Sequence, residues 1–171
     1  MPAAEEEDFL DVEDEGDLDD LEQDLMHEMT KYTERLDAAM VHYDTDKPDE
    51  RCVQRAIADM IRSKGIKCER EAYPCKGSRV RMDLSGVNFI VEVKMTTKKL
   101  HETIGQLLYY SEKKDGHKRL FIAVHDYNDF DLFDEVSECD NFCIELVHAH
   151  ACAFFLDSSL RHDNLLQGYT K

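Results

Sequence analysis

The sequence has no tryptophan, no glycine-rich phosphate-binding loop and no long apolar run. A helix that spans a bilayer needs about 18 or more consecutive apolar residues, so no membrane span is expected. The apolar core of a signal sequence is also missing, because the chain opens with the acidic run 5–8. No serine-elbow or cysteine–histidine pattern of a covalent hydrolase stands out. These absences predict a soluble, intracellular protein of the cytoplasm or nucleus.

The six cysteines leave one alternative open. Without a signal sequence, reduced thiols are expected rather than disulfides. Cys139 and Cys143, followed by His148 and His150, suggest a zinc site, but their spacing matches no tight zinc knuckle, and Cys143 falls in the apolar run 142–147. Buried thiols are therefore the favoured interpretation.

Charge is distributed very unevenly along the chain. Residues 1–49 contain 19 of the 38 acidic residues and only three basic ones, a net charge of −16. Residues 50–171 have a net charge of −1, and within them residues 50–112 reach +4. The formal charge of −17 thus describes the N-terminal segment, and it does not exclude nucleic-acid binding by the rest of the chain.

The N-terminal segment divides into two parts. Residues 1–16 are acidic with few apolar residues, which predicts a disordered tail. Over residues 17–44, apolar residues recur every three or four positions and repeat at eleven, which predicts a long amphipathic helix. This helix either packs on its own domain or forms a homodimer or partner contact. The stripe consists of Leu18, Leu21, Leu25, Met29, Tyr32, Leu36, Met40 and Tyr43.

The pattern of apolar residues over 48–171 predicts one α/β domain. Pro48 is expected in the first turn of a helix that ends near Gly65. An antiparallel meander followed by crossovers gives a mixed β-sheet with helices on its faces. The expected elements are strands over 67–73, 79–84 and 88–94, a helix over 100–113, a strand over 119–125, a helix over 130–138 and a strand over 142–148, with 154–156 as a candidate edge strand.

Three charged residues interrupt the apolar strands of this domain. Strand alternation places Glu92 and Lys94 on one face, and pairing of Leu84 with Phe89 would place Asp83 diagonally opposite Glu92. Buried unpaired charge is strongly unfavourable, so a bound cation would explain the arrangement. Mg²⁺, with Mn²⁺ as a substitute, takes carboxylate, water and phosphate oxygens. Lys94 would then orient or deprotonate the attacking water, or stabilise charge on the phosphate.

Ordinary ion pairing is the alternative. In the same register Arg81 lies opposite Glu92, and Asp83 can pair with Lys94. This alternative leaves the polar face of the helix over 100–113 unexplained, as the next pair of residues shows.

Gln106 and Tyr110 share one side of that helix, away from the stripe formed by Ile104 and Leu108. Core packing is therefore not expected to explain them, and they face either solvent or a groove. The neighbouring lysines either meet phosphates or form a solvated face. These lysines are Lys98, Lys99, Lys113 and Lys114.

The constellation of Glu50, Asp83, residues 92–94 and residues 106–110 resembles the PD-(D/E)XK nuclease superfamily. It looks most like the RecB-like and lambda-exonuclease-like branch, which bears a Gln-x-x-x-Tyr motif. The resemblance covers about residues 48–125 and implies a restriction-endonuclease-like core, preceded here by the long helix. It also implies that Asp83 and Glu92 are metal ligands, that Lys94 is the catalytic lysine, and that Gln106 and Tyr110 lie near the substrate.

Two departures and one open role accompany the resemblance. Met82 replaces the proline before the aspartate, and the cysteines lack the tight cluster of the iron–sulfur members. Glu50 heads a buried helical stripe and can complete the metal shell, although a glutamate there also suits the helix dipole.

Two functions follow as hypotheses. The first is a Mg²⁺-dependent nuclease that hydrolyses single- or double-stranded DNA. The second is a non-catalytic module on the same fold that binds a partner through the helix over 17–44 and the acidic tail. No surface for reading base sequence is expected.

Overall fold

The computed structural model describes residues 15–114, 118–126 and 144–168. The helix expected over 130–138, the two cysteines at 139 and 143, and nearly all of the acidic tail lie outside these residues. In the part of the chain that the structure describes, no helix is both long enough and apolar enough to cross a membrane.

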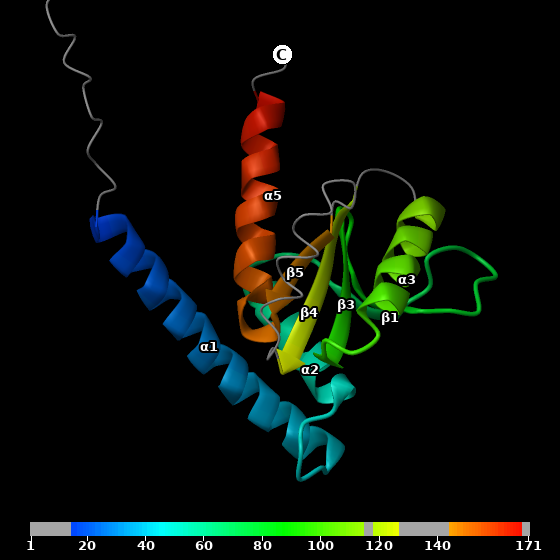
Figure 1. Cartoon of the computed structure of the whole chain (residues 1–171), viewed down its shortest axis with the longest axis horizontal. Coiled ribbons are helices and arrows are strands. Elements are labelled where there is room, and N and C mark those ends of the chain that lie inside the picture. The colour runs from blue at the N-terminus through cyan, green and yellow to red at the C-terminus, as the bar shows by residue number, and fades with distance from the viewer. Residues whose placement is uncertain (1–14, 115–117, 127–143, 169–171) are drawn as a thin grey trace, which may run out of the picture.

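A five-stranded mixed sheet forms the centre of the molecule (Figure 1). The first three strands in the order β1-β2-β3-β4-β5 are antiparallel neighbours, and β3, β4 and β5 are parallel. This arrangement confirms the expected α/β class, with β1 at an edge and β4 inside the sheet. The strands are β1 Glu69–Ala72, β2 Met82–Ser85, β3 Phe89–Thr96, β4 Arg119–Asp126 and β5 Ile144–His148.

Five helical elements accompany the sheet. They are α1 Glu15–Tyr43, α2 Glu50–Ser63, α3 Leu100–Lys113, the short 3-10 helix η1 Ala149–Ala151 and α5 Cys152–Gly168 among the described residues. The bounds of α3 are those expected from its pattern, because its apolar periodicity starts at Leu100 and its last turn is followed by an extended residue, Lys114.

Helix α2 begins after the expected position, at Glu50. Asp49 is its N-cap, and the Asp49 carboxylate accepts a hydrogen bond from the Cys52 N–H at 3.0 Å. Such a cap satisfies an otherwise unpaired donor of the first turn. Pro48 therefore precedes the cap instead of lying in the helix, and Glu50 is the first helical residue.

Each face of the sheet is covered by helices. On one face, α1, α2 and α5 pack against Phe89, Val91, Val93 and Phe121 (Figure 1). On the other face, α3 covers the side chains of alternate residues in β3, β4 and β5, which are Ile90, Leu120, Ile122, Val124, Ile144 and Leu146. The β3 alternation agrees with the sequence expectation, and it directs Glu92 to the α3 face.

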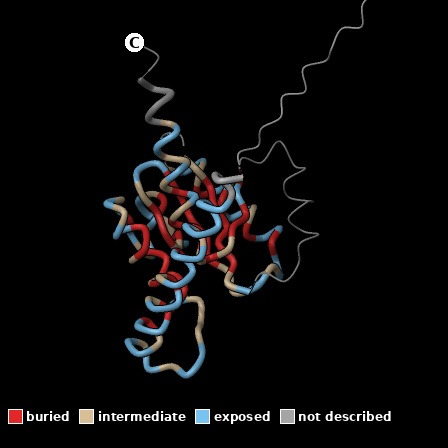
Figure 2. The backbone as a smooth tube through the Cα atoms, turned by 90° about the vertical axis from the view of Figure 1, so that its left-hand side faces the viewer, coloured by how far each residue is buried: buried red, intermediate tan, exposed pale blue. Residues whose placement is uncertain are grey.

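Helix α1 packs on its own domain over its second half. Tyr32, Leu36 and Ala39 belong to the main core, and the Tyr32 hydroxyl lies 2.8 Å from Nδ1 of His125 on β4. The first turns are different, because most of their residues are exposed (Figure 2). Leu21 and Met26 are 42% and 69% exposed. The domain therefore includes the C-terminal half of α1, and its first turns extend away from the core.

The candidate edge strand over 154–156 is wrong. These residues lie in α5, where Cys152, Ala153 and Leu156 are buried at helical spacing against the same core as α2. The short apolar run suggested a strand, but the buried positions continue with a period near four.

Candidate functional site

The β2–β3 hairpin brings the two strand carboxylates face to face. Leu84 pairs with Val91 and Ser85 with Ile90, so the expected pairing of Leu84 with Phe89 is wrong. The reason lies in the turn, where the Gly86 N–H donates to the Phe89 carbonyl at 3.0 Å, which moves the turn by one residue to Val87 and Asn88. A side chain at residue 86 would clash with the Phe89 ring, so this turn requires glycine. The same register places Asp83 directly opposite Glu92 instead of diagonal to it.

Each of the two carboxylates is held by the backbone of the opposite strand. The Asp83 N–H donates to Glu92 Oε1 at 3.2 Å, and the Val93 N–H donates to Asp83 Oδ2 at 2.8 Å. Side-chain oxygens thus take positions that carbonyl oxygens take in a regular ladder. Backbone N–H groups thus fix the two carboxylates beside one another.

Burial raises the pKa values of both carboxyl groups, and the proximity of Asp83 adds to the increase at Glu92. Burial raises the pKa of Glu92 to about 8, and the neighbouring charge of Asp83 contributes in the same direction. Burial also raises the pKa of Asp83, against the opposing effects of the Val93 hydrogen bond and the Lys94 charge. Two buried carboxylates that resist ionisation form a site where either a proton or a cation is favourable.

Lys94 lies at the rim of this pair. Its Nζ is 3.9 Å from Glu92 Oε2, and its side chain is 24% exposed, against 4% for Glu92. Arg81 precedes β2 and pairs with Glu71 at 3.4 Å, so the ion-pair alternative between Arg81 and Glu92 is wrong. Lys94 is therefore the cation next to the pair, and it contacts Glu92 rather than the expected alternative partner Asp83.

Glu50 approaches the site from the first turn of α2. Burial raises the pKa of its half-buried carboxyl, the charge of Lys94 lowers it, and the charge of Asp83 raises it. The Glu50 carboxyl group therefore interacts electrostatically with both Lys94 and Asp83. The start of α2 and the β2–β3 pair therefore converge on one region.

The number of donors decides which metal fits this region. Among the described residues, no three histidine, cysteine, aspartate or glutamate side chains are close enough to hold an ion by themselves. Zinc usually requires three or four such ligands. Mg²⁺ is usually bound by one or two carboxylates, with water and substrate phosphate completing the shell. The facing pair of Asp83 and Glu92, with Glu50 nearby, fits Mg²⁺ or Mn²⁺.

Gln106 and Tyr110 do not share an environment. Tyr110 is 3% exposed, and its hydroxyl donates to the Arg81 carbonyl at 3.1 Å, whereas Gln106 is exposed. Burial raises the pKa of Tyr110 to about 12, and the negative charges of Glu92 and Asp83 contribute in the same direction. Tyr110 thus supports the chain beside Asp83 from within the core, and only Gln106 faces outward.

The expectation that Tyr110 lies outside the core is wrong because the inner face of α3 is rotated from the expected one. Leu108, expected inside, is 40% exposed. The residues of α3 that are buried are Leu100, Thr103, Leu107 and Tyr110.

Two lysines have a structural role that the sequence did not indicate. Lys114 Nζ donates to the Gly86 carbonyl at 2.6 Å, and Lys118 Nζ donates to the Val87 carbonyl. Both lysines hold the turn that fixes the β2–β3 register. No local pattern could show this, because the acceptors lie about thirty residues away in the chain. Lys114 is thus engaged by the protein rather than extended toward a phosphate.

Comparisons with known proteins add no family to this geometry. A scan against protein-family models, a search of curated proteins and a search of solved structures each found no match to the chain.

Proposed function

We propose that this protein is a Mg²⁺-dependent nuclease that hydrolyses DNA phosphodiester bonds, built on a PD-(D/E)XK-like core. The observation that carries the proposal is the facing pair of Asp83 and Glu92, with the Lys94 ammonium 3.9 Å from Glu92 Oε2. A carboxylate pair with raised pKa values next to a lysine is an unfavourable arrangement in an ordinary sheet. Such perturbed groups are characteristic of functional sites.

The proposed roles follow from the positions of the side chains. Asp83 and Glu92 would hold the metal, and Glu50, which does not form a three-ligand group with them, would act through its charge from the start of α2. Mg²⁺ supplies Lewis-acid stabilisation of the negative charge that develops on the phosphate. Lys94 is partly exposed beside the pair, where its ammonium can orient the attacking water or donate to a phosphate oxygen.

The rest of the hairpin supports these groups. The backbone N–H groups of Asp83 and Val93 fix the carboxylates, and Tyr110 fixes the carbonyl of Arg81 two residues before Asp83. A site held by strands and buried hydrogen bonds keeps its geometry better than a site on loops. Gln106 faces outward and is proposed to contact the substrate, whereas Tyr110 acts as a positioning residue.

A cleavage assay tests the proposal. Purified full-length protein is incubated with end-labelled single- and double-stranded DNA in Mg²⁺, in Mn²⁺ and in excess chelator. Asp83→Asn, Glu92→Gln and Lys94→Ala are each expected to lower the cleavage rate at least about 100-fold, as loss of a charge-stabilising group does. Glu102→Gln, an exposed change on α3, is the matched control and should cleave at the wild-type rate. Cleavage that persists in both Asp83→Asn and Lys94→Ala would sink the mechanism.

A second candidate function is a non-catalytic module on the same fold. The observation that favours it is the set of exposed apolar side chains on the first half of α1, where Met26 is 69% exposed and Met29 is 49% exposed. Calorimetry with Mg²⁺ separates the two candidates, since only the nuclease requires the ion. Absence of Mg²⁺ binding together with absence of cleavage would favour the module. The protein for this test should keep α1, because Tyr32, Leu36 and Ala39 are part of the core.

A further inference from the structure

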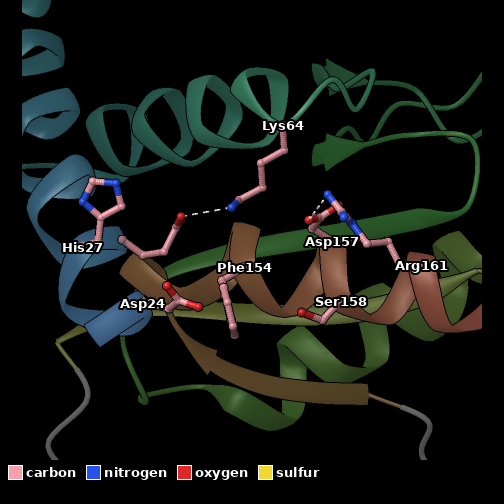
Figure 3. Close-up of a pocket in the computed structure, with 8 residues that line it drawn as sticks. Asp24, His27, Lys64, Phe154, Asp157, Ser158 and Arg161 are labelled. Atoms are coloured by element: carbon pink, nitrogen blue, oxygen red, sulfur yellow. Dashed lines mark hydrogen bonds and ion pairs between the residues drawn. The ribbon is translucent and has the colours of Figure 1, made fainter. Parts of the chain in front are cut away.

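A polar cavity lies on the face of the sheet opposite α3. It has a volume of about 290 Å³ and opens between the first half of α1, the C-terminal end of α2 and α5 (Figure 3). Its walls combine acidic and basic side chains with the aromatic rings of His27 and Phe154. The lining residues are Asp24, His27, Glu28, Lys64, Phe154, Asp157, Ser158 and Arg161.

Glu28 is the unusual member of this lining. It is 5% exposed, although it belongs to a helix whose neighbouring positions face solvent. Its Oε1 accepts a hydrogen bond from Lys64 Nζ at 3.0 Å, and Lys31 Nζ is 3.8 Å from the same oxygen. Its Oε2 is buried and has no hydrogen-bond partner among the described residues. A buried acceptor without a partner is unfavourable, so a ligand that donates a hydrogen bond to Glu28 Oε2 would be stabilised in the cavity.

The charges around the cavity decide which kind of donor fits. The lysine and the arginine of the lining are already engaged, Lys64 with Glu28 and Arg161 with Asp157 at 3.0 Å. The remaining basic residue of the lining is His27, which is exposed. Asp24 has no ion pair within the described part of the chain. The acceptors that remain are therefore Glu28 Oε2 and the Asp24 carboxylate, and both select for positive charge.

The surroundings strengthen this selection. Residues 19–28 of α1 carry five acidic residues and no lysine or arginine. The Phe154 ring already has Lys64 Nζ 6.0 Å from its centroid, and the face of an aromatic ring favours cations. Zinc is not favoured, because no three of the described histidine, cysteine, aspartate or glutamate side chains cluster closely enough to hold it.

We propose that this cavity binds an organic cation, a guanidinium or primary ammonium group that donates to Glu28 Oε2 and is neutralised by Asp24. The group arrives either on a basic protein segment or as a free amine, and the two sources present the same chemistry. The site lies on the opposite face of the sheet from Asp83 and Glu92, and it does not depend on the proposed nuclease activity.

Titration calorimetry on the full chain tests the proposal with three probes. Agmatine represents a free amine, the peptide acetyl-Gly-Arg-Gly-amide represents a protein segment, and the same peptide with citrulline is a neutral control of nearly equal shape. Agmatine, the arginine peptide or both should show saturable binding with one site per chain, and the citrulline peptide should not bind. Tighter binding of the peptide identifies a protein segment as the source, and binding of agmatine alone identifies a free amine.

Matched variants separate the cavity from the general acidity of α1. Glu28→Gln removes one negative charge inside the cavity and should weaken binding by about tenfold or more. Asp20→Asn removes the same charge from an exposed position on the same helix outside the cavity, and it should change affinity by less than about twofold at physiological salt. If Glu28→Gln does not fold, Asp24→Asn serves in its place, with an expected weakening of roughly threefold.

Three results would overturn the proposal. One is the lack of saturable binding by both cationic probes, in which case water alone satisfies Glu28. Another is equal binding of the arginine and citrulline peptides. The third is equal weakening by Asp20→Asn and by the cavity variants.

Discussion

Asp83 and Glu92 lie directly opposite each other on β2 and β3, and each carboxylate accepts a hydrogen bond from the backbone of the other's strand. Only one oxygen of each group is used in this way. The other Glu92 oxygen, Oε2, is the atom nearest to Lys94, at 3.9 Å. The pair is thus fixed by the protein on one side and remains able to accept a cation on the other, which leads to the first two predictions.

Stability should depend on the protonation of Glu92. Its pKa is raised in the folded state from an ordinary value of 4.5 to about 8, so the folded protein binds a proton that the unfolded chain releases. The stabilising contribution is fully present below about pH 4.5 and is lost as the pH rises through about 8. Urea unfolding in chelator should therefore show a decrease of roughly 2–4 kcal/mol between about pH 5.5 and 8.5. Glu92→Gln should remove most of this decrease, and an unchanged slope in that variant would contradict the prediction.

Mg²⁺ should restore stability at high pH. A ligand that binds only the folded state stabilises it by about 2.7 kcal/mol when its concentration is 100 times the dissociation constant. Thermal unfolding at about pH 8 should shift upward with Mg²⁺ in the wild-type protein and in Glu102→Gln. Asp83→Asn combined with Glu92→Gln should abolish the shift. A shift of equal size in the double variant would show that the ion binds elsewhere.

Tyr110 and Gln106 should have separable effects. Tyr110→Phe removes the hydrogen bond to the Arg81 carbonyl and should lower the free energy of unfolding by about 1 kcal/mol. Gln106→Ala changes an exposed side chain and should leave stability within about 0.5 kcal/mol. Urea unfolding measures both values. In the cleavage assay Gln106→Ala should mainly raise KM for DNA, and an unchanged KM would remove Gln106 from the substrate contact.

The sequence predicted those parts of the fold that depend on local pattern. The bounds of α3, the alternation in β3 and the mixed sheet all follow from the spacing of apolar residues. The register of β2 against β3 could not be predicted from the sequence, because it depends on a turn that Lys114 and Lys118 hold from a distant segment. For the candidate site, the alternation of side chains along the strands predicted that Asp83, Glu92 and Lys94 converge. It could not predict that Asp83 lies directly opposite Glu92, because that depends on the register.

Two further differences have a common cause. The sequence showed that α1 and α3 are amphipathic, but the face that each buries depends on the neighbours it meets. Tyr110 is buried because its hydroxyl reaches a carbonyl beside β2, and Glu28 is buried because Lys64 lies opposite it. A polar residue whose hydrogen-bond partner is far away in the chain is therefore predicted to be exposed when only the sequence is considered.

Removal of residues 1–14 should increase DNA affinity. This segment carries seven acidic residues and no basic ones, so it repels DNA or competes with it for basic surface. The increase, measured by fluorescence anisotropy with labelled DNA, should be largest at low salt and should fade near 0.5 M salt as charges are screened. A full-length variant with the seven acids changed to amides should behave like the truncated protein. Equal affinity with and without the segment would exclude autoinhibition.

The packing of α1 can be tested on two apolar positions of the same helix. Leu36 is 8% exposed in the main core, whereas Val41 is 82% exposed. Leu36→Ala should cost about 2–4 kcal/mol in urea unfolding, because it leaves a cavity. Val41→Ala should cost less than about 0.5 kcal/mol. Similar losses at both positions would contradict the described docking of α1.

The contact between Tyr32 and His125 joins residues 93 positions apart in the chain. During synthesis α1 therefore leaves the ribosome long before the strand that holds it exists, and η1, another of its neighbours, emerges later still. Until then, α2, which follows α1 directly in the chain, can pack on it, but the part of α1 that meets β4 and η1 stays uncovered. The acidic residues between its apolar positions disfavour association of nascent chains at that surface. The packing of α1 can therefore be completed only after β4 and η1 have been made.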